Sequence, residues 1–148
     1  MIPKTDKINH KLWVPSMVYL INHQGNQRDK RYFRWHDSGD IQSLDHLKKI
    51  VEICKLTPEV KHWLPTREYK TVSDFLKCEE FPANLNVILS AHMIDKLPPK
   101  MRGVCGSTVT KDKAPLGLNC PANTQNGQCL DCRACWNKTN KVISYNYH

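Results

Sequence analysis

The chain has 148 residues, 40% of them hydrophobic, and it carries a formal net charge of +8. This length fits a single domain, and because no run approaches about 18 apolar residues the sequence excludes a membrane-spanning helix. The first residues lack the apolar run of a secretory signal, so we expect a cytoplasmic protein with no membrane partner.

The positive charge is spread along the chain rather than gathered in one tract. Residues 27–34 (QRDKRYFR) form the one denser group. A basic balance favours polyanionic partners, yet scattered Lys and Arg are also what a solvated surface carries. Nucleic acid is therefore kept as an alternative partner.

The first predicted elements are a helix, a strand and a second helix. Apolar residues at helical spacing predict a helix over residues 13–21, with Pro15 in its first turn. The aromatic run 32–36 predicts a short strand. Ser43 is placed to cap the next helix, whose apolar stripe covers residues 44–54.

The same alternation of strand and helix continues through the middle of the chain. Residues 60–64 predict a second strand, closed by Pro65. Thr71 and Asp74 resemble a capping box at the start of a short helix. Residues 85–90 are apolar and predict the third strand, at a spacing too long for a hairpin.

The final part of the chain carries two further candidate strands, over residues 104–110 and in the tail 141–147. Strands alternating with helices predict an α/β fold, a partial barrel-like parallel sheet of βαβ units with a Cys-rich metal-binding C-terminal loop. We divide the chain into a helical lead-in over residues 1–30, an α/β core over 31–110 and a Cys-rich tail over 111–148.

Polar clusters follow the three predicted strands of the core. The carboxyl ends of parallel strands meet at one edge of a sheet, where ligands usually bind. We therefore expect a ligand-binding rim at this edge. Its candidate residues are His36, Asp37, Ser38, Gly39, Asp40, Arg67, Glu68 and His92.

The rim has a simpler alternative, in which its charges only hold loops together. Asp37 or Asp40 can cap a turn, and Arg67 can pair with either of them. No catalytic residue is assigned, because the sequence contains none of the common hydrolase, metalloprotease or phosphate-loop motifs.

Four cysteines near the end of the chain have ligand spacing. Cys120, Cys129, Cys132 and Cys135 follow the pattern C-x8-C-x2-C-x2-C. Three cysteines separated by two residues, with a fourth nearby, are typical of iron–sulfur sites. Structural zinc sites more often use two well-separated pairs. The pattern favours a cluster, with 4Fe-4S as the first expectation and zinc as the alternative.

The remaining cysteines do not share this spacing. An odd total of seven argues against a disulfide framework, and a cytoplasmic chain keeps its thiols reduced. Cys54, Cys78 and Cys105 stand alone and are each expected to be small buried hydrophobes. His148 or Cys105 could replace one member of the four-cysteine set.

Several motifs together resemble the bacteriophage gene product 88 family. They are residues 33–40 (FRWHDSGD), 57–60 (TPEV), 63–68 (WLPTRE) and 129–136 (CLDCRACW). The resemblance covers roughly residues 32–148. It implies a phage protein in the host cytoplasm and, since we know the family as functionally uncharacterised, it implies no activity.

Longer members of that family carry a further N-terminal region with its own cysteines. The resemblance therefore implies that this chain corresponds to their C-terminal part. An N-terminal partner chain, or an oligomer, is one way to supply the cysteines that the longer proteins have.

A weaker analogy connects the first predicted strand with radical S-adenosylmethionine enzymes. A strand that ends in Gly39-Asp40 is similar to the strand-end motif that meets the methionyl amino group in those enzymes. The analogy implies S-adenosylmethionine at the rim and an auxiliary cluster at the four cysteines. The first-strand cysteines of those enzymes are absent, so the chain alone is not expected to perform their chemistry.

Overall fold

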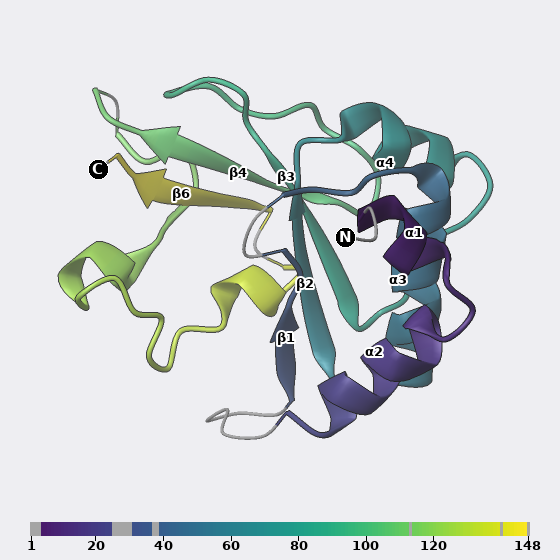
Figure 1. Ribbon diagram of the computed structural model, residues 1–148. Coiled ribbons are helices and arrows are strands. Elements are labelled where there is room, and N and C mark those ends of the chain that lie inside the picture. The colour runs from purple at the N-terminus through teal and green to yellow at the C-terminus, as the bar shows by residue number, and fades with distance from the viewer. Residues whose placement is uncertain (1–3, 25–30, 37–38, 113, 140, 148) are drawn as a thin grey trace.

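The centre of the protein is one curled, all-parallel sheet that forms a half-barrel (Figure 1). The computed structural model describes residues 4–24, 31–36, 39–112, 114–139 and 141–147. The strands are β1 (Tyr32–Arg34), β2 (Lys61–Thr66), β3 (Leu85–Ser90), β4 (Cys105–Thr110), β5 (Leu118–Asn119) and β6 (Val142–Asn146), in the order β1-β2-β3-β4-β6-β5. The α/β class and the partial barrel agree with the sequence prediction.

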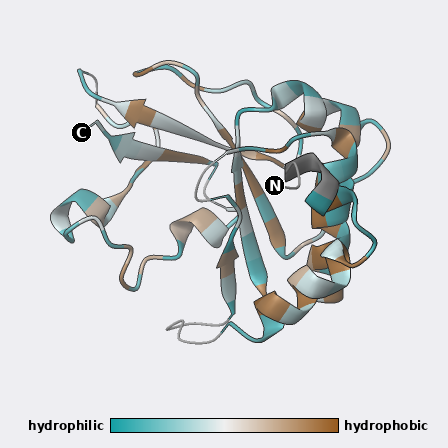
Figure 2. Ribbon diagram, in the orientation of Figure 1, coloured by the Kyte–Doolittle hydropathy of each residue, from teal (hydrophilic) through white to brown (hydrophobic). Residues whose placement is uncertain are grey.

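Helices cover one face of this sheet (Figure 1). They are α1 (Lys4–Asn9), α2 (Trp13–Asn22), α3 (Leu44–Leu56) and α4 (Tyr69–Leu76). Alternate strand residues such as Leu64, Val87 and Leu89 are fully buried against them. Figure 2 shows hydrophobic residues along both the strands and the helices. Strand side chains alternate between the two faces of a sheet. The residues next to these in the strands, such as Trp63 and Ile88, therefore point to the face opposite the helices.

The opposite face of the sheet is covered by the Cys-rich segment. Its short 3-10 helix η2 (Ala134–Trp136) contacts β2 and β3. Trp63, Ile88 and Ile143 form a second buried cluster with Cys135. The Cys-rich segment therefore covers the second face of the sheet. Its last strand, β6, joins the sheet by pairing in parallel with β4.

Helix α3 forms as its local sequence predicts. The Ser43 hydroxyl accepts a hydrogen bond from the His46 amide at 3.0 Å, which satisfies one free donor of the first turn. Asp45 lies in that turn, where its charge is favourable to the helix dipole. The apolar residues from Leu47 to Cys54 are buried in the core.

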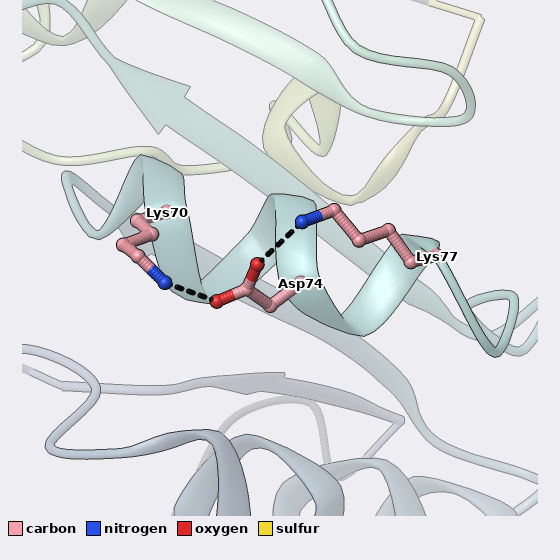
Figure 3. Close-up of polar contacts among 3 residues, drawn as sticks. All are labelled: Lys70, Asp74 and Lys77. Carbon is pink, nitrogen blue, oxygen red and sulfur yellow. Dashed lines mark hydrogen bonds and ion pairs between the residues drawn. The ribbon is translucent and has the colours of Figure 1, made fainter.

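The predicted capping box on the next helix is wrong. Helix α4 begins at Tyr69, so Thr71 and Asp74 lie inside it, and Glu68 at its start makes no side-chain cap. Figure 3 shows that Asp74 instead pairs with Lys70 at 2.7 Å and Lys77 at 2.9 Å. Residues three and four positions apart lie on the same helix face, so Asp74 forms ion pairs along the surface of α4 and does not cap its start.

Two strand predictions need correction at their ends. Strand β2 does not stop before Pro65 but runs through it to Thr66. Strand β5, which the sequence did not indicate, pairs with β6 at the sheet edge. A Cβ on Gly117, just before β5, would lie 2.4 Å from the Val142 carbonyl oxygen, so this close approach requires glycine. No helix among the described residues is long and apolar enough to cross a membrane.

Candidate functional site

The four predicted ligands line one small cavity on the face of the sheet opposite the helices. Cys120, Cys129, Cys132 and Cys135 surround a space of about 20 Å³ together with Trp136, Ile143 and neighbouring residues. The tertiary structure thus brings together all four cysteines that the spacing selected.

Different elements position these cysteines. Cys120 follows β5, and its amide donates to the Ser144 carbonyl oxygen of β6 at 2.8 Å. Cys129 and Cys132 flank a tight turn that is closed by a 2.9 Å bond from the Cys132 amide to the Cys129 carbonyl oxygen. Leu130 within this turn has a positive φ of 49°. The two sides of the cavity are therefore a sheet edge and a turn.

Cys135 is the most deeply held of the four. The Asn86 side-chain amide donates to the Cys135 carbonyl oxygen at 2.8 Å, and the Cys135 sulfur lies 3.3 Å from the Tyr145 hydroxyl. Burial raises the pKa of the Cys135 thiol to about 11, and the three neighbouring cysteines act in the same direction. The three neighbouring cysteines are thus close enough to disfavour a negative charge on Cys135.

The side chains are not arranged as a finished ligand set. Among the described residues, no group of three or more His, Cys, Asp or Glu side chains stands where it could hold a metal ion. The four cysteines share a cavity, and in the present rotamers they do not converge on one point.

The isolated cysteines differ from one another. Cys54 and Cys105 are buried, as predicted. Cys78 is exposed, because it lies in the turn after α4 rather than on the apolar face of that helix, and the prediction for it is wrong. The substitute ligand His148 lies outside the described residues.

The structure brings part of the predicted rim together. Asp40 accepts three hydrogen bonds, from the Ile41 amide at 2.7 Å, the Thr66 hydroxyl at 2.5 Å and the Arg67 amide at 2.8 Å. Arg67 thus approaches Asp40 through its backbone. These contacts tie the loop after β1 to the end of β2. They agree with the alternative in which Asp40 holds loops together and does not bind a ligand.

The other rim residues that the structure describes line none of the cavities found. The His36 ring is partly buried, with a positive φ of 55°, and burial lowers the pKa of its imidazole despite the opposing effect of Asp40. His92 packs on Tyr69 at the end of β3, with ring centroids 4.7 Å apart. Gly39 and Glu68 are exposed. Asp37 and Ser38 lie outside the described residues.

A buried polar network was missed by the sequence reasoning. The Trp35 indole donates to His62 Nδ1 at 3.1 Å, and His62 Nε2 lies 2.8 Å from the Thr57 hydroxyl. Because Thr57 donates to the Ile53 carbonyl oxygen, its hydroxyl accepts from His62. The ring is therefore neutral, and burial lowers its pKa to about 4. Pairing of β1 with β2 brings Trp35 to His62, and this long-range contact left no local spacing to indicate the network.

Two larger cavities lie at the amino ends of the strands, away from the predicted rim. One is formed around the starts of β4 and β6 and includes Cys105 and Val142. The other is formed around the starts of β1 and β2 and includes Tyr32 and Lys61. None of the rim residues that the structure describes lines either space.

Comparison with curated proteins and with solved structures found no match. The sequence model of the family described as Gene product 88 matches residues 4–138, which also takes in the helices α1 and α2 before the motifs noted above. A match over this much of the chain shows that the protein belongs to the gene product 88 family.

Proposed function

We propose that Cys120, Cys129, Cys132 and Cys135 bind one metal centre that fastens the Cys-rich segment to the sheet. The observation that carries this proposal is the shared cavity, which collects all four thiols from a sheet edge, a turn and a 3-10 helix. Thiolates pack together at low cost only when a cation offsets their charge.

An iron–sulfur cluster is the first candidate for this centre. The C-x2-C-x2-C run with a nearby fourth cysteine supports it. Trp63 Nε1 is buried on the same sheet face and has no hydrogen-bond partner among the described residues. Cluster sulfurs accept such donors, and these bonds help to set the cluster potential. A bound cluster would supply one-electron transfer.

Zinc is the second candidate, and the size of the cavity favours it. A space of about 20 Å³ holds little more than one water-sized sphere. A single tetrahedral ion needs less rearrangement of the loop than a cubane of eight atoms does. With zinc the centre would be structural, and the protein would act through its surface.

A surface on the same side supports nucleic acid as the partner in the zinc case. Three cations surround the Tyr32 ring: Arg133 at 4.9 Å, Arg31 at 5.9 Å and Lys61 at 6.0 Å from its centroid. Arg34 lies 4.7 Å from the centre of the Trp63 ring. Cations interleaved with aromatic rings are the means by which proteins hold single strands. The cysteine loop itself contributes Arg133.

The S-adenosylmethionine expectation stays a prediction. The parallel half-barrel and the strand-end pair Gly39-Asp40 favour it. Three protein donors already use the Asp40 carboxylate, which leaves it less capacity for a methionyl amino group.

Metal and sulfide analysis of protein purified without oxygen tests the proposal. A cluster gives iron with equal acid-labile sulfide and a brown colour, whereas zinc gives a colourless protein without sulfide. Cys132→Ser should lose the metal, and Cys78→Ser, an exposed cysteine outside the loop, should keep it. Equal metal content in both variants would refute the four-cysteine centre.

Binding of a single-stranded oligonucleotide at two salt concentrations tests the nucleic-acid candidate. Arg133→Ala and Lys61→Ala should weaken binding and reduce its salt dependence. Lys55→Ala on the exposed side of α3 is the control. Equal affinity in all three variants would remove this surface from consideration.

A further inference from the structure

A cavity of about 620 Å³ lies at the amino ends of β4 and β6, and the loop after β3 forms one of its walls. Its volume lies within the range of small-molecule sites, about 300–1,000 Å³. The walls are mostly apolar. They include Phe81, Leu97, Pro98, Met101 and Val104. Such a wall offers a place for a hydrocarbon or aromatic group away from water.

The loop that forms one wall is anchored at its start. The Asp95 carboxylate accepts hydrogen bonds from the amides of Lys111 at 2.9 Å and Asp112 at 3.1 Å. The Thr108 hydroxyl donates to the Lys96 carbonyl oxygen at 2.5 Å. These bonds join the beginning of the wall to the far end of β4.

The same wall is in close contact with the start of that strand. A Cβ on Gly106 would lie 2.7 Å from Pro98 Cγ, so glycine permits this approach. The wall is thus held against both the start and the far end of β4. The cavity is built into the fold, which lowers the ordering cost of binding a ligand.

The charges around the cavity have one predominant sign. Lys100, Lys138 and Lys141 line it, and none of the three forms an ion pair with another described residue. The remaining two charged groups, Arg102 and Glu80, pair with each other at 2.9 Å. The unbalanced charge is therefore positive.

We propose that this cavity binds a small amphipathic anion, in which an apolar body carries one carboxylate or phosphate group. The apolar wall takes the body, and the three lysines hold the anionic group at the mouth. Lys138 is half-buried and donates to the Pro82 carbonyl oxygen at 2.8 Å, which fixes its ammonium group near the cavity. The site is separate from the cysteine centre and does not depend on which metal that centre holds.

Titration of the full, metal-loaded chain with simple probes tests the proposal by amide NMR. Decanoate and decyl phosphate carry the two anionic groups on one apolar body, and decyltrimethylammonium carries the same body with a positive charge. Binding of either anion should shift the amides of Gly103 and Gly106, which line the cavity, and leave Gly39 and Gly127 unchanged. The relative affinities of the two anions identify the preferred group.

A charge-reversal pair separates specific from general attraction. Lys100→Glu with Lys141→Glu should weaken anion binding about tenfold or more, since like charges then face the anion. Lys48→Glu with Lys55→Glu makes the same change in net charge on the exposed side of α3 and should have little effect. Both pairs are on the surface, so folding is expected to survive.

Three results would overturn the proposal. The first is equal loss of affinity in the cavity pair and the control pair. The second is binding of the cationic probe at Gly103 and Gly106 as tightly as the anions. The third is absence of any shift at these two glycines with all three probes.

Discussion

The Trp136 indole donates a hydrogen bond to the Phe33 carbonyl oxygen at 3.1 Å, across 103 positions of the sequence. The same ring packs edge-on against Trp63 with centroids 5.2 Å apart. This one side chain therefore attaches the cysteine loop to the first two strands.

Replacing Trp136 separates the two parts of this attachment. Trp136→Phe removes the hydrogen bond and keeps a smaller aromatic ring, and it should lower the free energy of unfolding by about 1–2 kcal/mol. Trp136→Ala also removes the packing and should cost about 3 kcal/mol. Urea unfolding measures both values, and equal stabilities for the two variants would show that the ring packing is unimportant.

Asp40 is expected to act as a structural link at the end of β2. Asp40→Asn replaces one carboxylate oxygen by an NH₂ group, which cannot accept a hydrogen bond from the donor it faces. The change should lower the free energy of unfolding by about 2 kcal/mol. Glu52→Gln, an exposed neutralisation on α3, is the matched control and should change little. If both variants unfold at the same urea concentration, Asp40 is not the link we describe.

Buried histidine makes the protein less stable in mild acid. The native pKa of His62 is lowered from 6.5 to about 4, so between these values the unfolded chain binds the proton and the folded chain does not. Stability is thus full above about pH 6.5 and is lost as the pH falls toward 4. His46 adds to this effect, since burial lowers its pKa to about 4 as well.

Unfolding measured between pH 7 and pH 4.5 checks this dependence. Each histidine is expected to contribute a few kcal/mol at most. Trp35→Phe removes the donor that favours neutral His62, so its stability should fall less steeply with acid than that of the parent chain. An unchanged slope in this variant would exclude the Trp35 hydrogen bond as a contributor and would leave burial as the cause.

Two glycines in the tail should respond differently to alanine. Gly117→Ala puts a methyl group into the backbone of Val142 and should separate β5 from β6 at a cost of about 1–3 kcal/mol. Gly127→Ala meets open space and suffers only from its positive φ of 73°, so about 1 kcal/mol is expected. The reverse order of stabilities would contradict the close packing at Gly117.

Removal of the metal should loosen the loop that carries the cysteines. The segment from Pro115 to Gln128 is mostly exposed and has few apolar residues to order it. A chelator, or the Cys132→Ser change, should make this region sensitive to protease while the helices on the other face stay protected. Equal cleavage rates with and without metal would mean that hydrogen bonds alone order the loop.

The sequence by itself determined several local elements, and its spacing selected the four cysteines that share one cavity. Helix α3 has a side-chain cap and an apolar stripe within its own residues, and β3 is a short apolar run, so neither needs distant contacts to be recognised. The cysteine spacing is equally local. These signals depend on neighbours a few positions apart, which a sequence displays directly.

Only the tertiary structure decided what these elements face. Packing of β1, β2 and the end of α3 brings Trp35, His62 and Thr57 into one buried network. Asp40 accepts three hydrogen bonds that link the loop after β1 to the end of β2. Helix α4 begins at Tyr69, before the start predicted from Thr71 and Asp74, although these two residues have the spacing of a capping box. Packing against the sheet outweighs a local preference worth about 1 kcal/mol, and such long-range contacts leave no periodic trace in the chain.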